Sequence, residues 1–197
     1  NSIKRLSYLK KKFINLNLKI YRNKKTLPAF KNWSKAVNFC SGRYVYLHSD
    51  DDFVEKNFFN EIKNIVKKND HDLITWKVKP FINNKPKSFA WYRQWPRVNS
   101  GTFKPDSKFF KYPIPSSGYI AKRKFYEKYG IIGSQNEGYD LVCGIKFSTY
   151  AKKSYFASKT ISYYRMHSKQ SSIIDDPSKG LSRLNYFINS SNVFLKF

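Results

Sequence analysis

The chain of 197 residues carries 38 Lys plus Arg against 13 Asp plus Glu, a formal net charge of +25, and 41% of its residues are hydrophobic. This apolar fraction excludes a disordered chain and suffices for one substantial core, and the length favours a single domain over residues 1–197. The charge predicts an anionic partner: nucleic acid, an anionic membrane face or a phosphate-bearing substrate. The basic residues form short clusters along the whole sequence. The alternative to an anionic partner is that many of these lysines only solvate helix faces.

Neither a membrane span nor a disulfide framework is expected. No stretch approaches the roughly eighteen consecutive apolar residues that a span needs, and Asn1 begins no recognisable signal peptide. We therefore expect a cytoplasmic protein that is at most peripherally attached to a membrane. Cys40 and Cys143 each stand alone in their segments, a spacing that fits neither a disulfide framework nor a zinc site.

The start of the chain predicts two helices with a strand between them. Apolar residues recur at nearly helical spacing over residues 3–13, with lysines between them. Residues 16–21 alternate apolar and polar side chains, which is typical of a half-buried strand. Residues 32–40 predict a second helix, which ends at Ser41 and Gly42 because glycine readily adopts the left-handed conformation that ends helices.

A second strand follows and leads directly into three acids. Residues 44–47 form a short bulky run that is typical of a strand buried on both faces, and Asp50 to Asp52 come at its carboxyl end. A helix over 55–68 and a strand over 72–82 complete a strand–helix–strand unit. Such alternation predicts a three-layer α/β architecture with ligands at the carboxyl ends of the strands.

The rest of the chain has fewer patterns. Residues 83–115, which include the aromatic side chains Trp91, Tyr92 and Trp95, predict an irregular or hairpin insertion. Trp91, Tyr92 and Trp95 could form a platform for a sugar ring or belong to the core. Beyond the insertion, periodicity predicts helices over 123–129 and 139–150, a strand over 160–165, and a C-terminal helix over 177–197.

Three adjacent carboxylates repel one another, so a cation is expected beside Asp50, Asp51 and Asp52. Magnesium and manganese prefer oxygen ligands and are commonly held by one or two carboxylates while the phosphates of a substrate complete the shell. The alternative is a solvated turn that caps the next helix, because Asp is favoured at helix starts.

The residues around these acids resemble a known enzyme family. The stretches 32–37 (NWSKAV) and 42–52 (GRYVYLHSDDD) are similar to the core of family-2 glycosyltransferases, which carry an Asn-containing helix, a Gly-x-Tyr turn into a strand and an Asp-rich metal motif. His48 stands where the family often has Asp. The resemblance implies a GT-A, Rossmann-like fold with a central mixed, mostly parallel sheet, and a metal, Mn²⁺ or Mg²⁺, on Asp50 and Asp52.

Further matches follow in the family's order. Ser116-Ser117-Gly118 resembles the small-residue segment near the sugar, residues 137–141 (EGYDL) resemble the acidic helix start, and residues 164–167 (YRMH) resemble the closing Tyr-Arg-x-His segment. The resemblance implies that Asp140 is the catalytic base with Glu137 as its substitute, and that His167 approaches the metal. The resemblance implies a UDP-linked donor. It is expected to contact Lys31, Asn32, Asp50, Asp51, Ser117 and Gly118.

The implied reaction is inverting transfer of a sugar from a nucleoside-diphosphate sugar to a hydroxyl acceptor, a saccharide or lipid-linked saccharide of surface polysaccharide synthesis. The resemblance implies that the sequence begins just after the family's opening strand–helix–strand segment, whose last Asp contacts the nucleoside. Two other readings stay open. The net charge of +25 suits a nucleic-acid-binding protein, although no recognition motif is present, and an inactive transferase remnant could serve as an interaction module.

Overall fold

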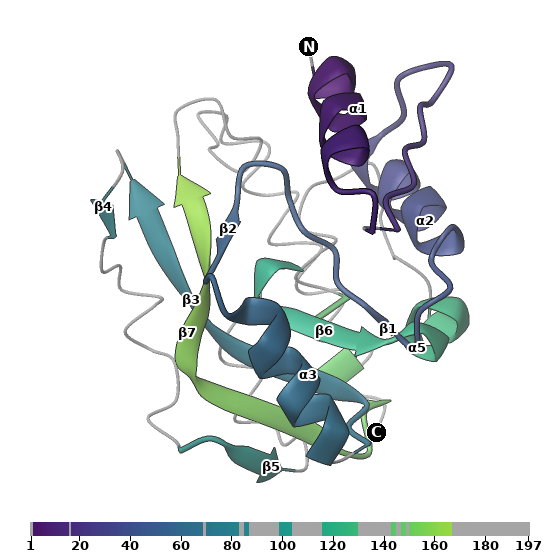
Figure 1. Ribbon diagram of the computed structural model, residues 1–197. Coiled ribbons are helices and arrows are strands. Elements are labelled where there is room, and N and C mark those ends of the chain that lie inside the picture. The colour runs from purple at the N-terminus through teal and green to yellow at the C-terminus, as the bar shows by residue number, and fades with distance from the viewer. Residues whose placement is uncertain are drawn as a thin grey trace, which may run out of the picture.

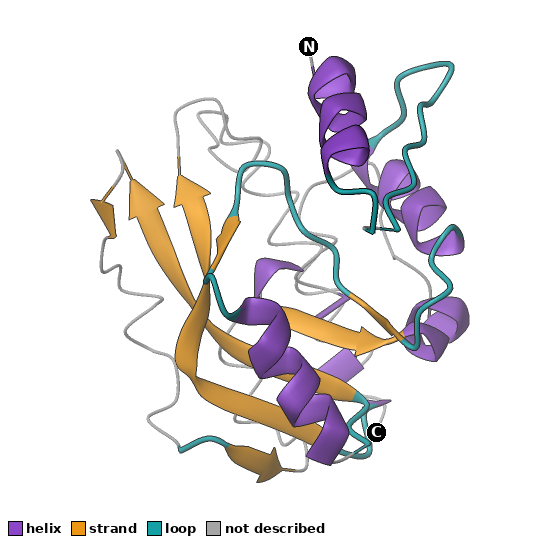
Figure 2. Cartoon of the chain, viewed as in Figure 1, coloured by secondary structure: helices purple, strands orange, loops and turns teal. Residues whose placement is uncertain are grey.

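The structure is a computed structural model that describes residues 2–15, 17–68, 70–82, 85–86, 99–103, 116–129, 143–144, 147–148 and 150–166. A central sheet runs through the molecule, with helices on its two faces (Figures 1 and 2). The expected α/β class is thus confirmed. No helix in these ranges is long and apolar enough to cross a membrane.

Seven strands of the described residues form the sheet, in the order β1-β6-β3-β7-β2, with β4 added beside β3 and β5 beside β7. The strands are β1 (Tyr44–Val45), β2 (Phe53–Val54), β3 (Leu73–Ile82), β4 (Lys85–Pro86), β5 (Gly101–Phe103), β6 (Tyr119–Lys122) and β7 (Ser154–Met166).

The sheet is mixed, as expected, but its described pairings are not mostly parallel. Only β3 and β7 pair in parallel, whereas the pairings of β1 with β6, β6 with β3, and β2 with β7 are antiparallel. The reason lies in β6, which enters between β1 and β3. These two strands keep the parallel direction that the crossover helix predicts, but each pairs with β6 and not with the other.

The helices are α1 (Ser2–Lys12), α2 (Ala29–Asn38), α3 (Phe58–Lys68) and α5 (Arg123–Tyr129), with a 3₁₀ turn, η2, at Ser116–Gly118. Alternation along β3 divides the core between the two faces of the sheet. Ile74, Trp76 and Val78 belong to the cluster that packs with Phe58 of α3. Leu73 belongs to the opposite cluster, whose other members include Val37, Phe125 and Phe147.

Several expected elements occur where the sequence predicts them. The helix predicted over 3–13 is α1, that over 123–129 is α5, and the strand predicted over 72–82 is β3. The helices predicted over 32–40 and 55–68 are α2 and α3, with starts at Ala29 and Phe58. Residues 143, 144, 147, 148 and 150 are helical, within the predicted 139–150. The predicted C-terminal helix and most of the insertion lie outside the described residues.

The strand predicted over 16–21 was wrong for residues 17–21, which contain no strand. Leu18 and Ile20 are half-buried and their neighbours Asn17, Lys19 and Tyr21 are exposed, so the alternation does reflect burial. A strand also needs a hydrogen-bonded neighbour, and none of the described strands pairs with this segment. Alternation therefore predicted the side-chain environment correctly and the hydrogen bonding incorrectly.

A buried ion pair joins β6 to the start of β3. Lys122 Nζ lies 3.0 Å from Asp72 Oδ1 and 2.6 Å from Asp70 Oδ1, and Asp72 Oδ2 accepts a 3.0 Å hydrogen bond from the backbone N–H of Lys152. Burial raises the pKa of Asp72, but Lys122, the Lys152 N–H and Lys124 outweigh burial and hold that pKa below its ordinary value of 3.8. Burial likewise lowers the pKa of Lys122, but Asp70 and Asp72 raise it above 10.5.

Candidate active site

The three consecutive aspartates lie in a turn between β1 and β2. The backbone N–H of Asp52 donates a 3.3 Å hydrogen bond to Ser49 O, and the chain then pairs with β7 through Phe53 and Val54. Because Phe53 pairs with Tyr163, near the end of the 13-residue strand β7, the turn lies at the carboxyl ends of the parallel pair β3 and β7 (Figure 1). This is the edge at which α/β sheets bind ligands.

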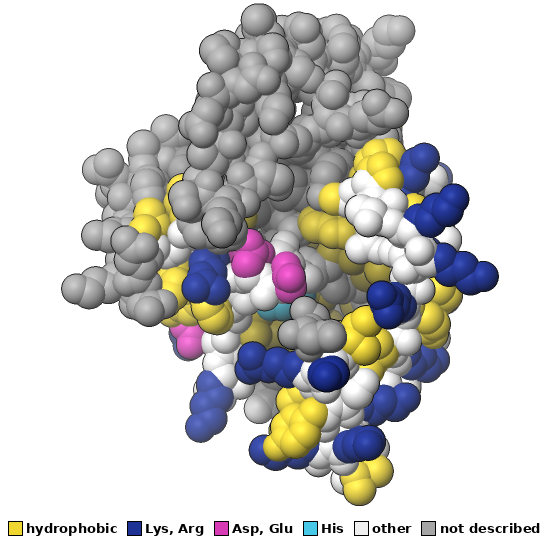
Figure 3. Space-filling view, turned by 90° about the horizontal axis from the view of Figure 1, so that it is seen from above, with side chains coloured by type: hydrophobic (Ala, Val, Ile, Leu, Met, Phe, Trp, Pro, Cys, Tyr) yellow, Lys and Arg dark blue, Asp and Glu magenta, His cyan; other side chains and the backbone are white. Residues whose placement is uncertain are grey.

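The carboxylate of Asp52 ties this turn to β7. Asp52 is buried, with 7% of its surface exposed, and its Oδ1 accepts a 3.0 Å hydrogen bond from the backbone N–H of Arg165. Asp51 is half-buried and Asp50 is exposed. Figure 3 looks down on this edge and shows acidic side chains and a histidine together in the middle of the face, with Lys and Arg side chains around part of it.

Tyr46 and His48 connect the segment before the acidic turn to η2. The Tyr46 hydroxyl donates a 3.3 Å hydrogen bond to Ser117 O, and His48 Nδ1 lies 3.1 Å from the Tyr46 oxygen. Burial, and then the charge of Asp52, raise the pKa of Tyr46 well above 10.0, so the phenol remains a donor. Partial burial lowers the pKa of His48 below 6.5, against the opposing effects of Asp52, Asp51 and Asp50.

The backbone carbonyl of Ser117 connects four parts of the chain. It accepts hydrogen bonds from Trp76 Nε1 at 3.0 Å, Ser162 Oγ at 2.5 Å and the Tyr46 hydroxyl at 3.3 Å. Trp76 Nε1 also donates to Ser162 Oγ at 2.7 Å. We call these four residues the Ser117 cluster. Through it η2 is fixed to β3, to β7 and, by way of Tyr46, to the segment that carries the aspartates.

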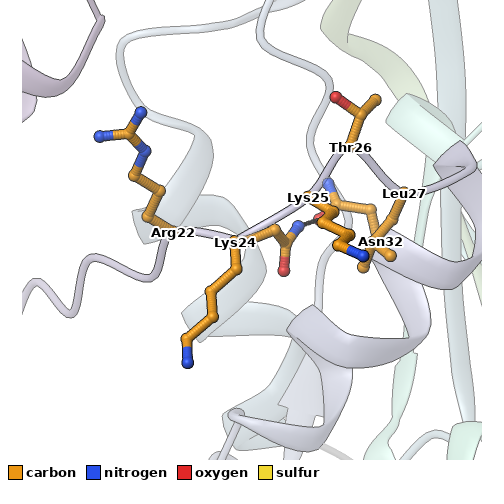
Figure 4. Close-up of a pocket in the computed structure, with 7 residues that line it drawn as sticks. Arg22, Lys24, Lys25, Thr26, Leu27 and Asn32 are labelled. Atoms are coloured by element: carbon orange, nitrogen blue, oxygen red, sulfur yellow. Dashed lines mark hydrogen bonds between the residues drawn. The ribbon is translucent and has the colours of Figure 1, made fainter.

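The predicted donor-contacting residues divide between two places. Ser117 and Gly118 are buried, and the Ser117 cluster joins them to the acidic turn. Lys31 and Asn32 are exposed on the first turn of α2, where Asn32 Oδ1 accepts a 2.6 Å hydrogen bond from Asn23 Nδ2. Asn32 lines an open pocket together with residues 22–27 (Figure 4).

Three predicted site residues lie outside the described residues. These are the base candidates Asp140 and Glu137 and the metal candidate His167, which all stay predictions. The aromatic side chains of Trp91, Tyr92 and Trp95 also lie there.

The metal expectation was compared with the donor atoms that the turn presents. In the described part of the chain, no three His, Cys, Asp or Glu side chains are grouped so as to hold a metal ion. Asp50 is nevertheless exposed, and Asp52 follows two positions later in the same turn; one or two carboxylates are what Mg²⁺ uses when substrate phosphates complete its shell. The chemistry of these donors therefore fits a divalent ion that binds together with a diphosphate.

Sequence reasoning missed the residues that position this turn. Arg165 acts through its backbone N–H, and the Ser117 cluster depends on Trp76 and Ser162, which lie 86 positions apart in the sequence. A backbone donor has no sequence signature, and no periodicity links such distant positions. The one available signal was the pair of small residues Ser116 and Ser117 before Gly118, which the resemblance singled out for another reason.

Comparison with known proteins gives structural neighbours only. No family model and no curated protein matches the chain. The 1–349 segment of S. aureus TarS in complex with UDP-GlcNAc superposes with a TM-score of 0.69 at 16% sequence identity, over 88% of this chain and 50% of that chain. The chain therefore shares the fold of this TarS segment.

Two further structures agree. The same TarS segment in complex with UDP gives a TM-score of 0.64 at 16% identity, over 81% of this chain and 47% of that chain. A structure of S. aureus TarS gives 0.65 at 16% identity, over 81% of this chain and 28% of that chain. The chain thus spans about half the length of the 1–349 segment. The expected open mixed sheet with helices on both faces is the architecture that these neighbours share.

Proposed function

We propose that this chain belongs to a glycosyltransferase that uses a UDP-linked sugar as donor and transfers the sugar, with inversion, to a hydroxyl acceptor. The observation that carries the proposal is the acidic turn at the carboxyl ends of β3 and β7, on a fold shared with a structure that binds UDP-GlcNAc. A surface saccharide or lipid-linked saccharide is the acceptor class that the family resemblance supports, and the enzyme would act at the cytoplasmic face of a membrane.

Asp50 and Asp52 are the proposed ligands of Mn²⁺ or Mg²⁺, with His167 as a third ligand. An ion bound there would supply Lewis-acid neutralisation of the diphosphate leaving group, which is worth several kcal/mol in such sites. Asp51 would contact the diphosphate of the donor only through that ion, whereas Lys31 and Asn32 would contact the donor directly. Ser117 and Gly118 would contact the sugar, and the hydrogen bond from Tyr46 to Ser117 O, which connects η2 to the segment before the acidic turn, supports this assignment.

Asp140 is the proposed general base, and Glu137 is its substitute. A carboxylate that reaches the attacking hydroxyl removes its proton as the new glycosidic bond forms, and such assistance contributes typically about 10² to 10⁴ in rate. The surrounding positive charge favours binding of a donor that carries two phosphates.

The direct test measures donor binding and turnover separately. UDP binding to the purified chain in the presence of Mn²⁺, followed by calorimetry, is expected to disappear in Asp50→Ala. It should persist in Glu61→Ala, an equal charge change on α3. Asp140→Asn is expected to keep UDP binding and to lower turnover about 10²-fold or more.

Two results would contradict the proposal. One is UDP binding that is unchanged by Asp50→Ala and indifferent to Mn²⁺. The other is turnover of UDP-sugars that survives Asp140→Asn and Glu137→Gln together in a folded protein.

A further inference from the structure

Three aromatic rings from three neighbouring strands meet beside the acidic turn. The ring centroids of Phe53 on β2 and Phe81 on β3 lie 5.2 Å apart, with 67° between the ring planes. Those of Phe81 and Tyr163 on β7 lie 6.1 Å apart, with 65° between the planes. Phe53 pairs with Tyr163, and Phe81 pairs with Arg165, two positions further along β7, so these four side chains share one face of the sheet. We call Phe53, Phe81 and Tyr163 the aromatic cluster.

The aromatic cluster lies on the face of the sheet opposite to α3. Val54 packs against the core cluster beneath α3, and Phe53 precedes it in the same strand. Val78 belongs to that core cluster, and Phe81 follows it by an odd number of positions along β3. Since successive side chains of a strand alternate between the two faces, Phe53 and Phe81 point away from α3. Their face is that of the other core cluster, which includes Phe147.

The cluster is accessible to solvent although its rings are apolar. Phe53 is 42% exposed, and Phe81 and Tyr163 are half-buried. Single exposed apolar side chains are ordinary on a protein surface, whereas contiguous ones mark a binding site more often. An edge-to-face contact covers the face of only one of its two rings, so ring surface stays available to a ligand. Cross-strand aromatic contacts also stabilise a sheet, but that role does not require the exposure of Phe53.

Polar and charged groups surround these rings. The guanidinium of the exposed Arg165 lies over the ring of Phe53, 5.7 Å from its centroid. The Tyr163 hydroxyl donates a hydrogen bond to Oε1 of the half-buried Glu55. A carboxylate oxygen accepts more than one hydrogen bond, and a guanidinium has several N–H donors. The site therefore combines apolar ring faces with groups that bind hydroxyls. A sugar needs both, because its C–H groups pack on aromatic faces and its hydroxyls form hydrogen bonds.

The aromatic cluster is continuous with the acidic turn. Phe53 directly follows Asp52, whose Oδ1 accepts the 3.0 Å hydrogen bond from the backbone N–H of Arg165. Figure 3 shows hydrophobic and basic side chains directly beside the acidic ones at this edge. Trp76, which donates to Ser117 O, belongs to the core cluster beneath α3. The group that fixes Ser117 and the aromatic cluster thus lie on different faces of the sheet, with the acidic turn at the edge between them.

We propose that the aromatic cluster, with Arg165 and Glu55, binds a sugar ring of the acceptor. The inference rests on the proposed transferase function and names the acceptor side of that site. In a transfer with inversion, the acceptor oxygen attacks the anomeric carbon from the side opposite to the leaving diphosphate. The new C–O bond forms as the bond to the diphosphate breaks, and the acceptor proton passes to the general base. Donor and acceptor therefore need separate surfaces that meet at one place, and the acidic turn is where these two faces meet.

The test measures sugar binding to the whole chain by ligand-observed NMR, with the methyl glycosides of glucose, galactose, mannose and N-acetylglucosamine as probes. UDP and Mn²⁺ are present in excess, so that a glycoside cannot bind in place of the nucleotide. Phe53→Ala is expected to weaken binding of the tightest glycoside at least about tenfold. Phe53→Trp should keep the dissociation constant within about threefold, because a larger ring still stacks on the sugar.

The matched control is Phe59→Ala, which removes the same ring from α3 on the opposite face, where Phe59 is 74% exposed. It should change the dissociation constant less than about twofold. Arg165→Gln keeps the backbone N–H that Asp52 accepts and removes only the guanidinium. This variant is expected to weaken binding about threefold or more, and it replaces Phe53→Ala if that variant does not fold.

Two further readouts separate a structural role of Phe53 from sugar binding. Melting temperatures show which variants are folded, and UDP binding with Mn²⁺, measured on the same samples, should persist in Phe53→Ala. The proposal is overturned if none of the glycosides binds the wild-type chain, or if Phe53→Ala and Phe59→Ala weaken binding equally. It is also overturned if a folded Phe53→Ala loses UDP binding, because the ring would then belong to the donor site. Glycoside binding that depends on Phe53 in a chain that binds no UDP would support the sugar site and contradict only the donor assignment.

Discussion

At the scale of single residues, the three adjacent aspartates have different surroundings. Asp52 is buried and bonded to a backbone N–H of β7, whereas Asp50 is exposed on the same turn. Removing the Asp52 carboxylate should therefore lower stability, whereas removing the Asp50 carboxylate should affect ligand binding.

Asp52→Ala is expected to lower the free energy of unfolding by about 1–3 kcal/mol, because the Arg165 N–H loses its acceptor in a buried place. Asp50→Ala should change stability by less than about 0.5 kcal/mol, as exposed substitutions do, while abolishing Mn²⁺-dependent UDP binding. Urea denaturation and calorimetry on both variants measure these effects. Equal stability losses would contradict the assignment of Asp52 as the residue that fixes the turn.

The Lys122–Asp72 pair gives the fold a defined pH dependence. The pKa of Asp72 is below 3.8 in the folded chain, so its stabilisation is complete above about pH 5 and is lost as the pH falls through the folded value. The pKa of Lys122 is above 10.5 in the folded chain, so its contribution is complete below that pH and is lost as the pH rises through the folded value.

Asp72→Asn should therefore cost about 3 kcal/mol near pH 7 and flatten the acid limb of the stability curve. Lys122→Met should flatten the alkaline limb. Denaturant midpoints between pH 3 and pH 11 measure both limbs, with Glu127→Gln, a surface acid of α5, as the control. An acid limb of unchanged steepness in Asp72→Asn would show that other carboxylates govern it.

At the scale of the elements, the Ser117 cluster makes β3, β7 and η2 depend on one another. Ser162→Ala is expected to cost about 1 kcal/mol, because Ser117 O loses one of three donors and Trp76 Nε1 loses one of two acceptors. Trp76→Phe should cost about 2–4 kcal/mol, since it removes a buried donor and leaves a void. Because these residues share one network, a double-mutant cycle should give a coupling of about 0.5–2 kcal/mol, and additive losses would contradict it.

The sequence predicted elements best where a helix or strand carries its own periodic pattern. α3 and β3 were found because their apolar residues recur at the helical and the strand period. β6 was missed because its four residues are all buried and show no alternation. Residues 17–21 show alternation but pair with no described strand, and pairing depends on residues far away in the sequence.

The candidate site was predictable to a similar extent. Asp50 to Asp52 stand out because three acids follow a bulky run in a chain poor in acids. The distinction between the buried Asp52 and the exposed Asp50 depends on β7, more than a hundred residues later, and so was not predictable from local sequence. The open pocket of residues 22–27 and Asn32 was also not predicted, because in the sequence Arg22, Lys24 and Lys25 do not differ from the other clusters of basic residues.

At the scale of the whole molecule, the proposed donor should act as a stabilising ligand. A ligand that binds only the folded chain at one hundred times its dissociation constant adds about 2.7 kcal/mol to the free energy of unfolding. UDP with Mn²⁺ is therefore expected to raise the melting temperature by several degrees, and Mn²⁺ alone should not. Differential scanning calorimetry measures this shift. The same shift in Asp50→Ala would place the nucleotide elsewhere, and none in the wild-type chain would count against donor binding.

The strand order also constrains how the chain folds during synthesis. β1, β3 and the acidic turn all precede their partners β6 and β7 in the sequence, so pairings such as Val45 with Ala121 and Phe53 with Tyr163 close long loops. Folding that depends on such distant pairings is slow. A ribosome that has translated this sequence only as far as residue 100 carries the aspartates without their partner strands, and this edge of the sheet can be assembled only after β7 has emerged.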